Sequence, residues 1–251
     1  MTFRTEDELA KQIKTHQRLA YAFLFLLIFV IVALVLSIAS LIGKAYAIFF
    51  VCAPLFILLV VMMVLIARYY KKEEKESSHY PYEVKLSYEV SFKELKHTLS
   101  AIANADECRD FPNKSAYFCF LDMTFKNRFL AVNTDYFVIS DFDSIKKSIN
   151  KAINKEYSVS QWAPRYELAK MMRINLIVTN DVNGELYEYV SRNAGNSLRR
   201  TEGVISFAVV RDSLIVPPLF GDNDVLTVKR YKKSIQDMKE LLGSAYKYGD
   251  R

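Results

Sequence analysis

The residues that most often carry catalysis are few in this chain, and their spacing fits none of the common enzyme sites. The histidines are His16, His79 and His97, and none follows in the rest of the 251 residues. A Ser-His-Asp or Cys-His site needs a histidine beside its nucleophile, and no GxSxG turn occurs that would present a serine. The glycine-rich phosphate loops GxxxxGKS/T and GxGxxG are also missing. The pattern favours a protein that is not an enzyme.

The cysteines indicate neither a metal centre nor a disulfide framework. Cys52, Cys108 and Cys119 show no CxxC spacing, no histidines cluster with them as zinc would require, and their number is odd. Unpaired thiols fit a reducing compartment. We expect no cofactor.

Two polar segments are the candidates for binding a small ligand. RINLIVTND predicts a buried strand, so Thr179, Asn180 and Asp181 stand where α/β sheets usually place ligands. The same residues also suit the capping of the helix that follows. The loop 192–203 is polar and basic, which suits a phosphate, an acidic partner or simple solvation. Its cations are Arg192, Arg199 and Arg200.

An alternative interpretation is a metal-dependent enzyme. Residues 92–179 are predicted to run α-β-β-β-α-β, an order that resembles the core of the PD-(D/E)xK nucleases. Such enzymes hold a metal with an aspartate and a nearby acid-x-Lys triplet on adjacent strands, and Asp122 and Asp135 lie near predicted strand positions. The predicted third strand, 135–140, contains no such triplet, and the only one, Glu83-Val84-Lys85, precedes the first helix. The resemblance therefore implies a divergent or inactive hydrolase or nuclease.

The elements that position these residues begin with an apolar segment, 19–67, whose single charge is Lys44. As one helix it would be about 73 Å long, whereas a bilayer core is about 30 Å thick. A lysine at mid-bilayer costs about 2.5–3.5 kcal/mol, and at the tip of a turn it reaches the headgroups. We therefore predict two membrane spans, about 19–42 and 46–68, with the turn at Gly43-Lys44.

The charges that flank the spans predict the orientation. Arg18 closes a basic segment before the first span, Arg68 opens another after the second, and the connecting turn carries Lys44 alone. Positive residues stay inside, so both termini of this two-pass integral membrane protein should be cytoplasmic. Thr5 and Glu8 have capping-box spacing, which predicts that a helix in the N-terminal segment, 1–18, continues into the bilayer.

A charged linker, 69–81, is expected to lead into a cytoplasmic mixed α/β domain, 82–251. Apolar alternation and buried runs predict strands at 82–90, 115–125, 128–133, 135–140, 173–181, 204–210 and 213–217. Residues 106–114 are predicted to be a loop. Stripes and caps predict helices from Ser91, from Asp141 or Asp143, over 160–172, from Asn180 or Asp181, and from Asp222 or Asp224 to Gly243.

Charge and motif content then favour one function over two others. The net charge of +6 is divided evenly between residues 1–78 and the rest, so nucleic-acid binding is not expected. The favoured interpretation is a membrane-anchored, non-catalytic binding or interaction domain, whose partners are the lipid bilayer and a protein partner or further copies of itself. The alternatives are the membrane-tethered hydrolase or nuclease and an oligomeric membrane pore or effector.

Overall fold

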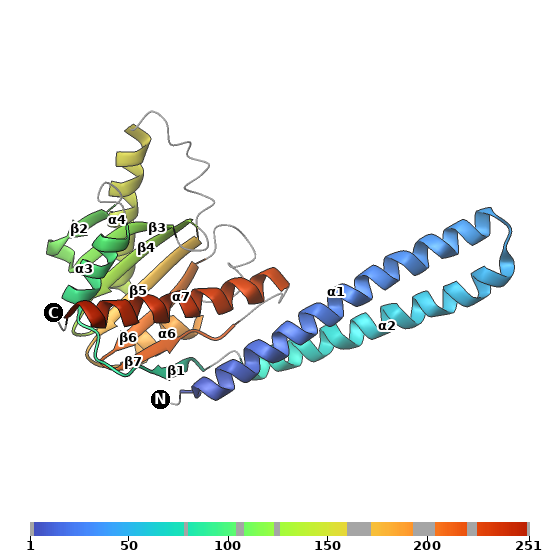
Figure 1. Cartoon of the computed structure of the whole chain (residues 1–251), viewed down its shortest axis with the longest axis horizontal. Helices are drawn as coiled ribbons and strands as arrows, with labels where there is room; N and C mark the ends of the chain where they lie inside the picture. The colour runs from blue at the N-terminus through green and yellow to red at the C-terminus, as the bar shows by residue number, and fades with distance from the viewer. Residues whose placement is uncertain are drawn as a thin grey trace.

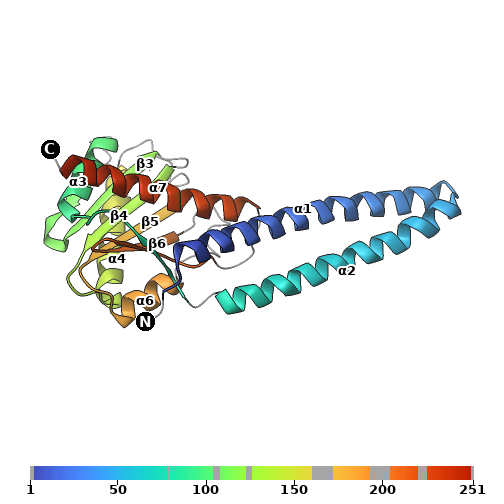
Figure 2. The ribbon, with the colours of Figure 1, turned by 60° about the horizontal axis from the view of Figure 1, so that its bottom comes forward.

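The computed structural model describes residues 3–77, 80–103, 108–122, 126–159, 172–192, 204–219 and 225–249. It has two parts, a long helical hairpin and a mixed α/β domain, and the hairpin projects away from the domain (Figure 1). The start of the hairpin lies against the domain, while its tip is far from it (Figure 2).

Two long helices, α1 (Glu6–Ile42) and α2 (Tyr46–Ser77), lie side by side in the hairpin. By length and composition, both are apolar and long enough to cross a membrane. Thr5 begins α1 through the predicted capping box. The Glu8 N–H donates to Thr5 Oγ1 at 3.4 Å, and the Thr5 N–H donates to Glu8 Oε2 at 2.8 Å.

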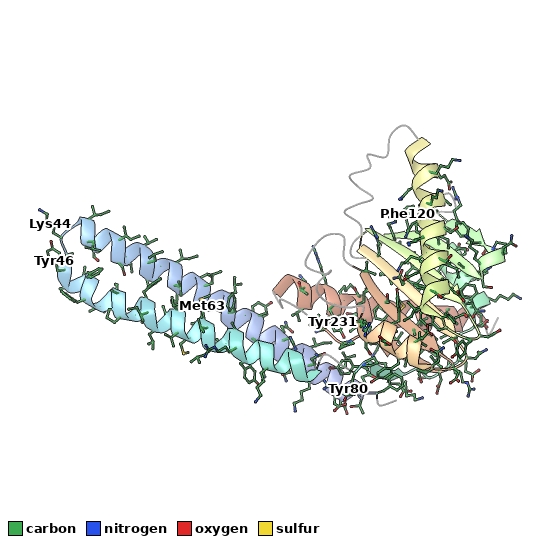
Figure 3. All side chains as sticks on the ribbon, turned by 180° about the vertical axis from the view of Figure 1, so that it is seen from behind. Lys44, Tyr46, Met63, Tyr80, Phe120 and Tyr231 are labelled. Atoms are coloured by element: carbon green, nitrogen blue, oxygen red, sulfur yellow. The ribbon has the colours of Figure 1, made fainter. Side chains whose placement is uncertain are left out.

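The turn of the hairpin lies at the predicted Gly43-Lys44 position. Lys44 and not Gly43 takes the left-handed conformation, with φ of 55° against −76° for Gly43. The Gly43 N–H still closes the helix by donating to the Ala39 carbonyl at 2.9 Å. Lys44 and Tyr46 lie at the end of the hairpin that is farthest from the domain (Figure 3).

Small side chains let the two helices approach each other. Ala33, Ser37 and Ser40 are buried, and α2 is the element that lies beside this part of α1. The two serine hydroxyls bond within α1, Ser37 to the Ala33 carbonyl at 2.7 Å and Ser40 to the Ser37 carbonyl at 2.9 Å. They therefore present no unsatisfied polar group to the partner helix.

A seven-stranded mixed sheet forms the centre of the domain, in the order β1-β7-β6-β5-β4-β3-β2. The three strands β4, β5 and β6 are parallel, and every other neighbouring pair is antiparallel. The bounds are β1 Tyr82–Lys85, β2 Cys108–Phe111, β3 Ala116–Asp122, β4 Lys126–Asn133, β5 Met172–Thr179, β6 Val204–Val210 and β7 Ser213–Val216.

Helices cover both faces of this sheet (Figures 1 and 2). On one face α3, α7 and the first turns of α1 pack on a core that includes Leu9, Leu99 and Tyr231. On the other face α4 and α6 pack on a second core that includes Ile149 and Leu186. The bounds are α3 Phe92–Ile102, α4 Ile139–Val159, α6 Gly184–Arg192 and α7 Val225–Gly249, and the 3-10 turn η2 is Pro112–Lys114.

The hairpin is joined to the domain through the segment that precedes α1 and the segment that follows α2. The Arg4 N–H donates to the Pro81 carbonyl at 3.0 Å, and the Glu83 N–H donates to the Arg4 carbonyl at 2.8 Å. Glu6, in the first turn of α1, forms an ion pair with Lys239 of α7. The segments that precede α1 and follow α2 therefore meet at the edge strand β1.

The structure corrects four of the predicted features. Residues 135–140 are not a strand, because α4 begins at Ile139. The Ile139 N–H donates to the side chain of Glu185 in α6. Asp141 consequently lies inside the first turn of α4 instead of capping it. Residues 108–111 form the strand β2 within the predicted loop, since η2 turns the chain so that β2 pairs with β3. Gly243 lies inside α7, which continues to Gly249.

The predicted strand 82–90 is shorter in the structure, since β1 ends at Lys85. Other predicted elements are found near their expected positions. Ser91 caps α3 and accepts from the Lys93 N–H at 3.3 Å. The α7 stripe that includes Val228, Tyr231 and Leu242 is buried as predicted. The predicted helix 160–172 lies almost entirely outside the described residues, as do Asp222 and Asp224.

Candidate functional site

The predicted ligand residues lie at the carboxyl edge of the parallel strands, where β4 and β5 end side by side. Thr179 Oγ1 donates to the Asp135 carbonyl and Asn180 Nδ2 donates to Asp135 Oδ1, both at 3.4 Å. These are long, weak hydrogen bonds. The structure therefore brings Asp135 next to Thr179 and Asn180, a contact between two sequence-predicted groups.

The strongest polar contacts at this edge belong to helix capping. Asn183, and not Asn180 or Asp181, caps α6, since its Oδ1 accepts from the Leu186 N–H at 2.8 Å. Asn183 Nδ2 also donates to the Phe137 carbonyl at 2.6 Å. The Asp181 carboxylate accepts from the adjacent Val182 N–H at 2.8 Å.

Glu185 ties the two helices of this face together. It lies in the first turn of α6, and its Oε2 accepts from the Ile139 N–H at the start of α4 at 2.8 Å. A carboxylate at two helix N-termini is stabilised by both helix dipoles. This contact stabilises the start of α4 at Ile139. The helix therefore begins inside the segment 135–140 that was predicted as a strand.

The topology also removes the crevice that would make this edge a binding site. Ligands bind α/β sheets where successive crossovers leave in opposite directions. Here β4, β5 and β6 follow one another in one direction, and α4 and α6 both pack on the same face. Thr179, Asn180 and Asp181 therefore lie beside two capped helices and not at a switch point.

The two aspartates of the metal alternative lie at opposite ends of one hairpin. Asp122 ends β3 and is paired with Lys126 at the start of β4, whereas Asp135 follows the other end of β4. Eight residues of strand separate these ends by about 26 Å. Among the described residues there is no group of three or more His, Cys, Asp and Glu side chains that could hold a metal ion.

The α-β-β-β-α-β order of the nuclease resemblance is present as α3-β2-β3-β4-α4-β5, with β2 in place of the predicted third strand. The strand β4, with the sequence KNRFLAVN, carries no acid-x-Lys triplet. Glu83-Val84-Lys85 lies in β1, and the strands β7, β6 and β5 separate it from β4. The residues that define that chemistry are therefore not assembled.

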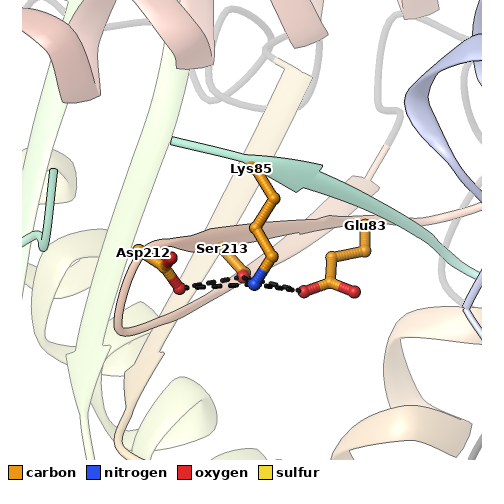
Figure 4. A network of polar contacts seen from close by, with 4 residues as sticks. All are labelled: Glu83, Lys85, Asp212 and Ser213. Atoms are coloured by element: carbon orange, nitrogen blue, oxygen red, sulfur yellow. Dashed lines mark hydrogen bonds and ion pairs between the residues drawn. The ribbon is translucent and has the colours of Figure 1, made fainter. Parts of the chain in front are cut away.

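A serine and a lysine do meet at the edge of the sheet (Figure 4). Lys85 Nζ lies 2.8 Å from Ser213 Oγ, 3.0 Å from Glu83 Oε1 and 3.4 Å from Asp212 Oδ1. A lysine that activates a serine must lose its proton, which requires burial away from carboxylates. The hydrogen bond that Lys85 donates to Glu83 raises the pKa of Lys85 instead. The group is therefore an exposed ion-pair network and not a catalytic dyad.

Two cysteines that are distant in sequence face each other across β2 and β3. Cys108 and Cys119 are direct partners in the strand register, and no disulfide joins them. The nearby Tyr117 Oη lies 2.6 Å from Ser100 Oγ. Burial raises the pKa of Tyr117, and a hydrogen bond with Cys108 raises it further, so the phenol stays protonated.

The basic loop is only partly described. Arg192 ends α6 and forms an ion pair with Glu188, one turn earlier, at 2.5 Å. Most of its side chain is exposed, which is typical of a solvated helix end. Arg199 and Arg200 lie outside the described residues.

The sequence analysis missed a pair of arginines at the amino ends of β4 and β5. Arg128 and Arg173 are direct partners in the parallel register. Their side chains lie on the face covered by α4, since Leu130 and Ile177, which follow at even spacing, belong to that core. Each arginine is the first residue of a strand segment that is mostly apolar, RFLAVN from Arg128 and RINLIVT from Arg173. This repeated pattern was the sequence signal that could have revealed the pair.

Comparison of this chain with protein-family models, with curated proteins and with solved structures finds no match.

Proposed function

We propose that this chain is a two-pass membrane protein whose mixed α/β domain lies in the cytoplasm and binds a ligand or partner without catalysis. The observation that carries the proposal is an apolar hairpin with exposed side chains, joined at its base to a folded domain. The described residues of that domain assemble no catalytic constellation. Each part of the proposal has its own support.

The surface of the hairpin supports membrane insertion. Large apolar side chains point outward along both helices, such as Phe25 at 60% exposed and Phe50 at 73%. Exposed apolar area costs about 25 cal/mol per Å² in water, and this cost disappears in a bilayer. The apolar length of α1, 19–42, is about 36 Å, which spans a core of about 30 Å with some tilt.

The charge distribution supports a cytoplasmic domain. Lys14 and Arg18 lie exposed at the base of α1, and Arg68 and Lys72 lie exposed at the base of α2. At the tip, Lys44 is the one cation of the turn. The positive-inside rule then places the base, and the domain fixed to it, on the cytoplasmic side.

The contacts at the candidate sites argue against catalysis there. The polar residues of the carboxyl edge are engaged in capping, and the lysine of the edge network is held protonated. A general base needs a pKa near the working pH and a position facing a substrate. Lys85, which its neighbouring carboxylate keeps protonated, does not meet the first condition.

Cysteine labelling in intact cells tests the membrane part. In a background with the native cysteines replaced by alanine, a membrane-impermeant maleimide should label Lys44→Cys from outside. A matched control, Lys232→Cys on the exposed face of α7, should be labelled only after permeabilisation. Labelling of Lys232→Cys, but not Lys44→Cys, in intact cells would overturn the orientation.

Activity assays test the non-catalytic part. The purified full chain, in detergent with Mg²⁺ or Mn²⁺, should not cleave single- or double-stranded nucleic acids or a phosphodiester model substrate. Turnover that is abolished by Asp122→Ala or Asp135→Ala would contradict the proposal and support the metal-dependent alternative.

A further inference from the structure

We propose that Arg128 and Arg173 form a binding site for a phosphate group at the amino ends of β4 and β5, on the face covered by α4. The inference rests on the proposed function, because it names the class of ligand that the binding domain takes. The site lies at the opposite end of the parallel strands from Thr179 and Asn180.

The strand register places the two guanidinium groups together. Arg128 and Arg173 are direct partners on neighbouring parallel strands, which run about 4.8 Å apart. Paired residues of adjacent strands project to the same face of a sheet. The backbone therefore brings two like charges to the same part of this face, and the charge of Arg173 acts on Arg128.

Apart from Arg173, the described contacts of Arg128 are with neutral groups. Its side chain is 6% exposed. Arg128 Nη2 donates to Asn150 Oδ1 at 3.1 Å and to Asn154 Oδ1 at 3.4 Å, and the guanidinium lies over the ring of Phe118. Burial and the charge of Arg173 lower the pKa of Arg128 to about 10, which still leaves it fully protonated at neutral pH.

The described residues supply no carboxylate to either arginine. No ion pair joins Arg128 or Arg173 to an Asp or Glu in the described part of the chain. The Nε atoms of both side chains are buried there without a hydrogen-bond partner. A buried charge without a counter-charge is strongly unfavourable, so the pair needs an anion.

The surface next to the pair also favours an anion. On α4, Lys147 and Lys151 lie one turn from each other and within three or four residues of Asn150 and Asn154, so they share that side of the helix. Both lysines are exposed. Arg173 is only half-buried, so part of its side chain is exposed to solvent in the described structure.

A phosphate group matches this arrangement better than a carboxylate does. A phosphate monoester carries a charge of about −1.5 to −2 at neutral pH, which balances two guanidinium groups. Its three terminal oxygens can accept from both planar arginine forks at once, whereas a carboxylate offers two oxygens and a charge of only −1.

Binding of inorganic phosphate to the purified full chain in detergent tests the site. Saturable binding is measured by titration calorimetry at constant ionic strength, with chloride replacing phosphate in the reference. Arg173→Gln, at the half-buried position, should weaken binding by about tenfold or more, because it removes one of two charge-assisted contacts. Lys232→Gln on α7 removes an exposed cation elsewhere and should leave binding unchanged.

Two results would overturn the proposal. The first is an absence of saturable phosphate binding, or binding that Arg173→Gln leaves intact. The second concerns Asp122, which lies on β3 two residues beyond Phe120, the register partner of Arg128, and whose side chain is outside the described set. If phosphate binds to Asp122→Asn but not to the unaltered chain, Asp122 is the counter-charge and the arginines are structural.

These outcomes are separate from a failure of the proposed function. Failure of phosphate binding with Lys44→Cys still labelled from outside would reject only the anion site. A reversed labelling pattern would reject the cytoplasmic domain and leave the phosphate measurement valid.

Discussion

Tyr231 links α7 to the rest of the domain, and replacing it with phenylalanine removes a single atom from the core (Figure 3). The side chain is fully buried, and its hydroxyl donates to the Pro217 carbonyl at 2.6 Å. Tyr231→Phe keeps the ring in place. It leaves the buried carbonyl of Pro217 without that donor, so the change isolates one hydrogen bond.

The expected cost at neutral pH follows from that loss. An unsatisfied buried acceptor costs about 1–3 kcal/mol. For a domain of about 150–250 residues, each kcal/mol lowers Tm by about 2–4 °C. We therefore expect Tyr231→Phe to lower Tm by about 2–12 °C at pH 7.

The cost should shrink in alkaline solution. Burial, with a smaller effect from Tyr82, raises the pKa of Tyr231 well above 10. The folded protein therefore holds this proton more tightly than the unfolded chain does. The stabilisation is fully present below pH 10 and declines by about 1.4 kcal/mol for each pH unit above it. Phenylalanine has no such dependence, so the two proteins should become equally stable about one to two units above pH 10.

Thermal unfolding of the full chain in detergent, followed by circular dichroism from pH 7 to pH 11, provides the measurement. Tyr136→Phe is the matched control, since Tyr136 is 68% exposed and its replacement should have little effect at any pH. A difference between Tyr231→Phe and the unaltered chain that stays constant above pH 10 would refute the reasoning. So would the absence of any difference at pH 7.

Three further predictions test individual contacts. Asn183→Ala should destabilise the protein by about 1 kcal/mol, because the cap of α6 is lost. Asn180→Ala removes a hydrogen bond that is 3.4 Å long and should cost less than about 0.5 kcal/mol. The reverse order of the two variants in thermal unfolding would argue against Asn183 as the cap. Leu95→Ala, at a fully buried position of α3, should cost about 2–5 kcal/mol in the same measurement, and a loss below 1 kcal/mol would contradict its burial. Mild oxidation should form a disulfide between Cys108 and Cys119 within one chain, because the Cα atoms of opposed antiparallel residues lie about 4.5–5.5 Å apart. Mass spectrometry of unreduced peptides would detect this link, and its absence would argue against the register of β2 and β3.

Elements with a strong local signal were predictable from the sequence. The capping box of Thr5 and Glu8 depends on residues three positions apart, and it forms as expected. The two long helices follow from the length of the apolar run and from its one charge, and the buried strand at 173–179 follows from continuous apolar residues. In each case the interaction that forms the element lies within a few neighbouring residues.

The failed prediction at 135–140 shows where local patterns stop being sufficient. The segment alternates like a strand, but β4, which ends just before it, already has β3 and β5 on its two sides. No sheet position next to β4 remains for it. Glu185, which is 46 residues from Ile139, accepts the first N–H of the helix that forms instead.

The candidate sites depended even more on distant contacts. Asn180 or Asp181 was predicted as the cap because both follow the buried strand, but the position of α6 makes Asn183 the residue whose side chain reaches the helix N-terminus. The proposed phosphate site joins two strands that are separated along the chain by α4. No spacing rule connects those two arginines.

By itself, the sequence determined that this protein has two apolar helices joined at Lys44 and a mixed α/β domain, because periodicity, run length and capping act over short distances. Only the tertiary structure decided the order of the seven strands, the helix that each polar side chain caps, and the meeting of Arg128 with Arg173. Those features depend on strand pairing between residues far apart in the chain, and pairing partners are selected by the packing of the whole sheet.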